Sequence, residues 1–195
     1  ARFASQLGFE LDPEAFDAML EMHERIEIIS QERIRDELSK LMCSDDPKPG
    51  LEILVDSKIA SIVLPELPAL KLESDEHHHH KDVYQHTLTV VAQAIGYESE
   101  YGLQGDLVVR LAALMHDVGK PATRRLESGG TVTFYHHDVV GAKLTKKRLT
   151  ALRFDNDTVA AVSRLVELHL RFFGYSDQQW SDSAVRRYVR DAGEQ

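Results

Sequence analysis

Apolar residues recur at helical spacing along nearly the whole chain. Side chains three and four positions apart share one face of an α-helix, so the pattern predicts a mainly helical protein. Asp12 and Ser30 each stand directly before such a segment, where N-cap residues are preferred, and Pro13 takes a first helical position. The predicted helices span residues 3–7, 13–29, 31–42, 51–59, 82–95, 106–116, 137–152, 157–172 and 182–191.

One region carries a strand signal. Thr123–Glu127 and Thr131–Tyr135 flank Ser128-Gly129-Gly130, an order of strand, glycine turn and strand that predicts a β-hairpin. Strands and helices do not alternate as a parallel sheet would require. The expected fold is therefore all-α, with one small hairpin near residues 123–135.

Prolines and a polar stretch divide the chain. Lys48-Pro49-Gly50 is expected to interrupt the helices, and the two prolines within residues 64–68 predict a non-helical connection. Residues 71–81 are polar and rich in histidine. We place the boundary between two units there, with a helical segment at residues 1–72 and a second domain at residues 73–195.

Composition limits the class of protein. The chain has 195 residues, of which 43% are hydrophobic, enough for one sizeable core. No apolar run approaches the roughly 20 residues of a membrane span, and no signal-peptide pattern opens the chain. The single cysteine, Cys43, excludes a disulfide framework, and its apolar neighbours predict a buried thiol. These features favour a cytoplasmic protein without a membrane segment.

The net charge of −9 is unevenly distributed. Residues 1–140 carry 25 acidic and 13 basic side chains, whereas residues 141–195 carry 7 acidic and 10 basic ones. The acidic balance disfavours a generic nucleic-acid binder. The later basic excess indicates either a solvated helix face or a surface that contacts a polyanion, through Lys143, Lys146, Lys147 and Arg148.

Nine of the ten histidines lie between His77 and His169. Histidine is the commonest metal ligand, so this concentration indicates a site. The strongest motif is His116-Asp117, at the end of an apolar helix and before Gly119, which we expect to let the chain turn away. A carboxylate beside an imidazole suits a divalent ion such as Mg²⁺, Mn²⁺, Ni²⁺, Fe²⁺ or Zn²⁺. Lys120 stands one turn after His116, where its ammonium can pair with a substrate phosphate.

His86 lies on the preceding amphipathic helix, whose apolar face should pack against residues 107–114 and bring His86 beside His116. Imidazoles on successive helices around a carboxylate are what a mono- or dinuclear hydrolytic centre requires.

Further histidines extend the set. His137 opens the helix after the hairpin, and His169 lies near the end of the next one. Each is expected to bind the metal, to orient a residue that binds it, or to bind phosphate. His136 is a rival for His137. The run His77–His80 is either a solvated loop or the source of one more ligand, with His80 the best placed.

These motifs together resemble the HD superfamily of metal-dependent phosphohydrolases. Three segments more narrowly resemble the C-terminal half of bacterial tRNA nucleotidyltransferases, the poly(A) polymerase family. Residues 1–9 are similar to the arginine-rich helix that closes the family's nucleotide-binding region, and residues 29–38 to its Ile-Ser-x-Glu-Arg-Ile neck motif. Residues 81–88 resemble the opening of its fused HD domain.

The resemblance implies a phosphatase or 2′,3′-cyclic phosphodiesterase acting on nucleotides or phosphorylated RNA ends, with a tRNA or RNA 3′ end as partner. It implies metal ligation by His86, His116, Asp117, His137 and His169, with Asp117 and Lys120 as catalytic residues.

The chain also departs from the family's pattern. It shows no strand with the paired aspartates of nucleotide transfer, because Asp155-Asn156-Asp157 precedes a helix as an N-cap. The chain starts at Ala1 without methionine, so we expect a piece of a longer protein whose catalytic head lies upstream. The late metal-binding aspartate of HD enzymes is expected beyond Gln195, since Asp191 fits that position poorly.

Two other functions stay open at this point. The chain is alternatively a non-catalytic RNA-binding body with a vestigial HD site, which the basic excess after residue 140 supports. As a third reading, it is a free-standing nucleotide-sensing HD protein that forms a homodimer.

Overall fold

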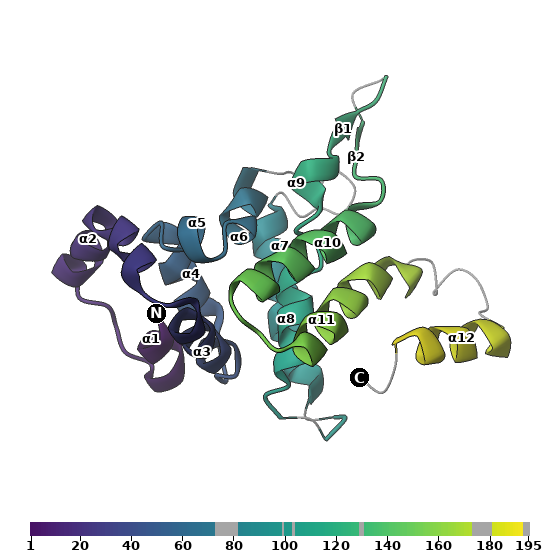
Figure 1. The fold of residues 1–195 in the computed structure, drawn as a ribbon, viewed down its shortest axis with the longest axis horizontal. Coiled ribbons are helices and arrows are strands. Elements are labelled where there is room, and N and C mark those ends of the chain that lie inside the picture. The colour runs from purple at the N-terminus through teal and green to yellow at the C-terminus, as the bar shows by residue number, and fades with distance from the viewer. Residues whose placement is uncertain (73–81, 99, 103, 129–130, 173–180, 193–195) are drawn as a thin grey trace.

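The computed structural model describes residues 1–72, 82–98, 100–102, 104–128, 131–172 and 181–192. The regular secondary structure of these residues is helical apart from one antiparallel hairpin, which confirms the predicted fold class (Figure 1). The helices are α1 (Arg2–Leu7), α2 (Pro13–Glu21), α3 (Gln31–Met42), α4 (Lys48–Asp56), α5 (Ala60–Val63), α6 (Glu66–Ala69), α7 (Val83–Glu98), α8 (Leu107–Met115), α9 (Lys120–Thr123), α10 (His137–Ala151), α11 (Asn156–Leu168) and α12 (Asp182–Ala192). The 3₁₀ helices are η1 (His23–Ile28), η2 (Leu70–Leu72) and η3 (His169–Phe172), and the strands are β1 (Arg125–Leu126) and β2 (Val132–Thr133).

The predicted helix caps are confirmed. Asp12 accepts hydrogen bonds from the backbone amides of Glu14 and Ala15, and Ser30 accepts one from Arg33. Helix α3 begins and ends where the pattern predicts, and its buried face carries Leu38, Leu41 and Met42. Asp155 caps α11 through the amide of Thr158, as expected from its position before the helix.

The predicted helix over residues 13–29 is wrong in its second half. Helix α2 ends at Glu21, and the chain continues as the 3₁₀ helix η1. The ring of His23 bonds the Leu20 carbonyl through Nδ1. Both helix types bring residues three positions apart toward one side, so an apolar pattern of only six residues does not separate them.

The predicted break at residues 48–50 is wrong, and the predicted connection over residues 64–68 is confirmed only at Leu64 and Pro65, between α5 and α6. Helix α4 begins at Lys48 with Pro49 in its first turn, and α6 begins at Glu66 with Pro68 in its first turn. The first backbone N–H groups of a helix have no intrahelical acceptor, so a proline there costs no hydrogen bond. These prolines start helices rather than end them.

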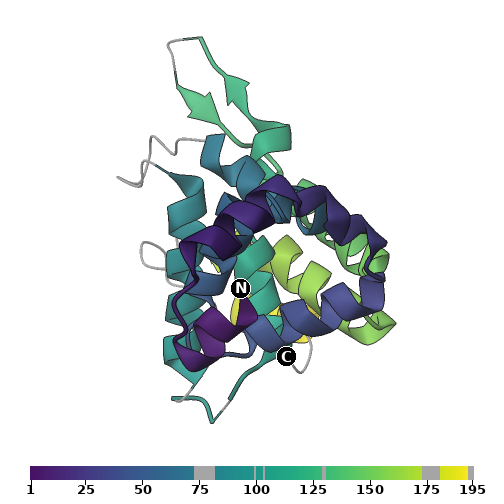
Figure 2. The same cartoon turned by 90° about the vertical axis from the view of Figure 1, so that its left-hand side faces the viewer.

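The second half of the chain packs α7, α8, α10 and α11 together, with α10 and α11 side by side (Figure 1). One cluster of buried side chains runs from Leu38 in α3 through Leu88 and Leu114 to Val166 in α11. The two halves therefore share a core. The hairpin projects from the helices in both views (Figures 1 and 2).

The hairpin is shorter than predicted. Arg125 pairs with Thr133 and Leu126 with Val132, whereas Thr123 belongs to α9. Gly129 and Gly130 lie outside the described residues.

The prediction of a buried Cys43 is wrong: its side chain is exposed at the end of α3, where Sγ lies 3.4 Å from the Gly105 carbonyl oxygen.

Three arginines join residues 1–72 to the later helices. Arg110 donates to the backbone carbonyls of Met42 and Ser44, Arg35 donates to that of Arg153, and Arg148 pairs with Glu66. The boundary between residues 72 and 73 stays a prediction, since residues 73–81 are not described. Among the described helices, none combines the length and apolarity needed to cross a membrane.

Candidate metal centre

The His116-Asp117 motif lies where α8 ends, and α7 packs against α8. His116 and His86 meet there with ring centroids 5.4 Å apart, which confirms the expected approach of the two side chains. His116 Nε2 lies 3.0 Å and His86 Nε2 3.9 Å from Asp117 Oδ2. These three residues form one group whose ligand atoms all lie within 4.8 Å of one another.

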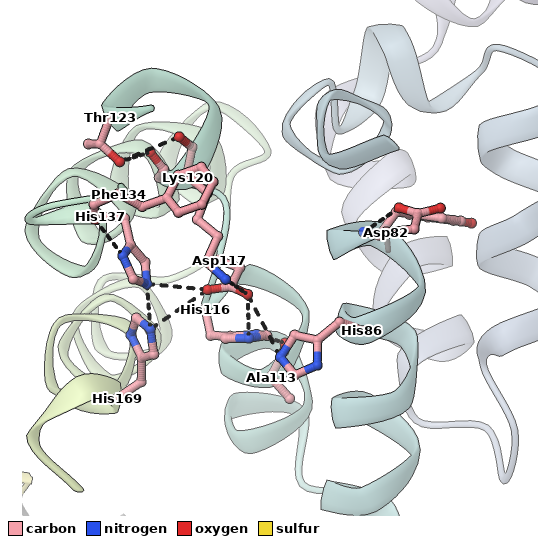
Figure 3. A network of polar contacts seen from close by, with 12 residues as sticks. Asp82, His86, Ala113, His116, Asp117, Lys120, Thr123, Phe134, His137 and His169 are labelled. Carbon is pink, nitrogen blue, oxygen red and sulfur yellow. Dashed lines mark hydrogen bonds and ion pairs between the residues drawn. The ribbon is translucent and has the colours of Figure 1, made fainter. Parts of the chain in front are cut away.

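A second group forms on the other side of the same carboxylate (Figure 3). His137, at the start of α10, places Nε2 3.3 Å from Asp117 Oδ1. His169, directly after α11, places Nε2 3.9 Å from the same oxygen. Asp117 therefore lies between two pairs of imidazoles, one facing each of its oxygens.

Backbone contacts orient three of the rings. The Nδ1 atoms of His116, His137 and His169 lie 2.8, 2.8 and 2.6 Å from the carbonyl oxygens of Ala113, Phe134 and Val166. A carbonyl oxygen only accepts, so each Nδ1 carries the proton, and in a neutral ring Nε2 presents a lone pair. This tautomer binds a metal through Nε2, with the backbone carbonyl as the orienting partner.

The centre is consequently rich in acceptors. His137 Nε2 and His169 Nε2 lie 3.2 Å apart, so two lone pairs face each other. Asp117 is 2% exposed, and its Oδ2 accepts no hydrogen bond in the described structure, although the Lys120 ammonium lies 3.1 Å from it. A buried carboxylate oxygen without a hydrogen bond, beside imidazole lone pairs, is the donor set that a divalent cation satisfies. The residues present fit a metal ion.

Two pKa shifts bear on the charges at this centre. Burial alone would raise the pKa of Asp117, but the positive charge of Lys120, together with His116 and His137 wherever their Nε2 atoms carry a proton, holds it well below its usual range. Burial lowers the pKa of His169 to about 4, against an opposing contribution from the Val166 carbonyl. At neutral pH the aspartate is thus ionised and His169 is neutral, the states in which each binds a metal.

Lys120 lies inside the centre. Its side chain is 9% exposed and places Nζ 3.1 Å from Asp117 Oδ2, with the Phe134 ring centroid 5.5 Å from Nζ. The structure therefore gives Lys120 a contact with Asp117. Its contact with a substrate phosphate stays a prediction.

Gly119 has a different role from the one expected. Its φ of −79° is accessible to any residue, so no special turn requires glycine here. A Cβ at this position would instead collide with the backbone of α10 at His137 and Gly141. The absence of a side chain lets α10 approach the His116-Asp117 turn, and that approach brings His137 to Asp117.

The structure separates the rival histidines. His136 is exposed and adopts a left-handed conformation with φ 62°, whereas His137 is buried at the centre. The run His77–His80 lies outside the described residues. Asp191 pairs with Arg171 at 2.6 Å and belongs to neither metal-binding group found among the described residues.

Sequence reasoning missed the carbonyls of Ala113, Phe134 and Val166. The only signal was that each residue stands three positions before a candidate histidine.

The helical fold and the His/Asp cluster define a helical domain with a centre that could hold a metal ion. The profile of the HD domain family matches residues 83–192, more than half of the chain, and the chain belongs to this family. A second profile, described as the probable RNA and SrmB-binding site of polymerase A, matches residues 8–70. The two matches lie in the two halves that the structure joins.

Three relatives match most of this chain. The chain is 33% identical to an A-adding tRNA nucleotidyltransferase of Deinococcus radiodurans, over 97% of this chain and 43% of that protein. It is 34% identical to a CC-adding tRNA nucleotidyltransferase of Thermus thermophilus, over 87% and 39%. It is 30% identical to a multifunctional CCA protein of Pseudomonas fluorescens, over 77% and 37%. The chain thus spans about two fifths of the length of these relatives.

Proposed function

We propose that the chain is a metal-dependent phosphohydrolase, of the phosphatase or 2′,3′-cyclic phosphodiesterase type, and forms part of a CCA-adding tRNA nucleotidyltransferase. The observation that carries the phosphohydrolase is the acceptor-rich centre around Asp117, where oriented imidazoles face both carboxylate oxygens. The relatives named above support the tRNA assignment.

A divalent ion held by His86, His116, Asp117, His137 and His169 would supply Lewis-acid activation of a water molecule and of a phosphoryl oxygen. The residues of the chain prepare that chemistry. The backbone carbonyls fix the imidazole rings, which keeps the ligand atoms converged before an ion arrives. The Lys120 ammonium adds a positive charge beside Asp117, where the anionic phosphate of a substrate would enter.

The test removes the metal with a chelator, reloads Mg²⁺, Mn²⁺, Ni²⁺, Fe²⁺ or Zn²⁺ singly, and measures hydrolysis of 2′,3′-cyclic AMP, 2′-AMP and p-nitrophenyl phosphate. We expect His116→Ala and Asp117→Asn to lower metal affinity by about 100-fold or more, because each removes a ligand rather than an orienting partner. Hydrolysis should be lost with the metal.

His136→Ala is the matched control, since it removes an exposed imidazole one residue from His137. It should bind metal and hydrolyse substrate as the unchanged chain does. An unchanged chain that takes up no ion, or that takes up ions and hydrolyses none of these esters, contradicts the proposal.

A second candidate function is a non-catalytic RNA-binding body with a vestigial centre. The profile match over residues 8–70 favours it. In that case RNA binding would persist in His116→Ala, and no metal-dependent hydrolysis would appear in the unchanged chain.

A further inference from the structure

A groove runs along the α10–α11 pair. Its volume is about 550 Å³, and α10 lines it from Val139 to Thr150 while α11 lines it from Asn156 to Glu167. Eleven residues of helix rise about 16 Å, so the groove follows nearly the full length of both helices. Its two ends are unlike. Val139 and Glu167 each lie two residues from a histidine of the metal centre, whereas Thr150 and Asn156 flank the turn between the helices.

The charges along this groove are mainly positive. Lys143 and Lys146 stand one helical turn apart on the α10 wall, and both are exposed. Neither makes an ion pair with a carboxylate of the described residues. On the α11 wall, Arg164 pairs with Glu167 at 2.7 Å, so these two charges offset each other. Two cations without a described counter-ion remain on one wall of a groove, an arrangement that attracts an extended anion.

The rest of the groove suits a chain that presents its backbone. Ala142 and Ala160 line it with small side chains, which lets a ligand lie close to the helices. Ser163 also lines it with a small side chain.

We propose that the α10–α11 groove binds the phosphodiester backbone of single-stranded RNA, with Lys143 and Lys146 contacting successive phosphates. RNA fits better than an acidic peptide because residues 8–70 of the same chain match a probable RNA-binding profile and two relatives carry tRNA in their names. The groove's end beside His137 and His169 places one end of the strand near the metal centre. That last step rests on the proposed function, whereas RNA binding in the groove does not.

The experiment measures binding of a fluorescently labelled short single-stranded RNA to the full chain by anisotropy, over a range of salt concentrations. Replacing Lys143 and Lys146 together by glutamine should weaken binding about tenfold and reduce the salt dependence by about 1.4 units of slope, or about 0.7 per phosphate contact in a single strand. Lys147→Gln is the matched control, because Lys147 is adjacent, exposed and does not line the groove. It should change the affinity less than twofold.

A second variant tests the groove without changing its charge. Ala160 is exposed, so Ala160→Phe should fold and fill the groove, and RNA affinity should fall as it does in the lysine variant. Wild-type affinity in either variant, or tighter binding of an oligoglutamate peptide than of RNA, overturns the proposal. Hydrolysis of p-nitrophenyl phosphate should be unchanged in both variants. A different result is that the unchanged chain hydrolyses none of the esters while the variants still lose RNA affinity. That result would contradict the proposed phosphohydrolase and leave the proposal of RNA binding in the groove intact.

Discussion

At the metal centre, one local contact repeats in three different helices. Each of His116, His137 and His169 lies at a helix end and donates from Nδ1 to the carbonyl three residues earlier. Carbonyls at the C-terminal end of a helix lack their usual amide donors, so His116 and His169 can take that role at the ends of α8 and α11. The Phe134 carbonyl instead belongs to the turn before α10. In all three cases the contact leaves Nε2 directed toward the centre.

The low pKa of His169 gives the first prediction. Its pKa of about 4 in the folded chain lies below the ordinary value of 6.5. Between these two pH values the unfolded chain therefore binds a proton on His169 more readily than the folded chain does. The contribution to stability is present above pH 6.5 and is lost as the pH falls toward 4. For the metal-free protein, moving from about pH 8 to about pH 5 should remove about 2 kcal/mol through this group.

Urea unfolding of the metal-free chain and of His169→Gln, at both pH values, isolates this contribution. The variant should lose less stability on acidification than the unchanged chain, by about that amount. Equal losses in the two proteins would show that His169 titrates at an ordinary pKa in the folded state.

At the scale of elements, the centre depends on how closely α10 approaches the turn after α8. Gly119 permits that approach, and Arg110 anchors α8 from its other end. Arg110 is 4% exposed and pairs with Glu98, itself 5% exposed, while it also donates to the carbonyls of Met42 and Ser44. Helix α8 is therefore tied to α10 at one end and to the end of α3 at the other.

Gly119→Ala tests the first of these contacts. The added Cβ collides with α10 backbone, which has to move, so we expect a loss of about 1–3 kcal/mol in stability and weaker metal binding as His137 withdraws from Asp117. Gly96→Ala is the control. Gly96 lies within α7 and its Cβ would meet nothing within 4 Å, so the variant should gain about 0.5–1 kcal/mol. Denaturant unfolding and metal titration of both variants check these two expectations. Unchanged metal affinity in Gly119→Ala would contradict the role of Gly119 in bringing His137 to Asp117.

Arg110→Met tests the second contact. It leaves the Glu98 carboxylate buried without its cation and two carbonyls without a donor, which should cost about 3–5 kcal/mol. Arg35→Met removes a contact to the Arg153 carbonyl from a side chain that is 31% exposed, and should cost about 1 kcal/mol or less. Free energies of unfolding from urea titration decide between these values. Similar losses in the two variants would mean that the buried Arg110–Glu98 pair contributes no more to stability than the Arg35 contact does.

The sequence predicted features that depend on residues close together in the chain better than those that depend on distant segments. The bounds of α3, its Ser30 cap and the His86–His116 approach were predicted, because periodicity and capping are local and the packing of two apolar faces follows from them. The sequence favoured His137 but left His136 as a rival, since the left-handed turn at His136 that separates them does not appear in a local pattern. The role of Gly119 was misjudged because the helix it accommodates begins 18 residues later. Contacts between distant segments are invisible to a local pattern.

Across the whole molecule, one core connects the two matched regions. The buried cluster contains Leu41 and Met42 of α3, in the region matched by the RNA-binding profile, and Leu114 and Val166 in the HD domain. Arg110, Arg35 and Arg148 add polar contacts between the same halves. A continuous core unfolds as one unit, so stabilisation at the metal centre should reach α3.

Metal binding tests this coupling. An ion that binds only the folded chain, at about a hundred times its Kd, should raise the free energy of unfolding by about 3 kcal/mol. Hydrogen exchange should slow in α3 as well as in α7 and α8, because their slowest amides exchange through unfolding of the shared core. Helices α1 and α2 contain no buried residues and serve as the internal control, since their amides should exchange through local opening at an unchanged rate. Slower exchange confined to α7 and α8, or two separate thermal transitions, would mean that the halves fold independently. The RNA-binding match and the metal centre would then be neighbours in sequence without mechanical coupling.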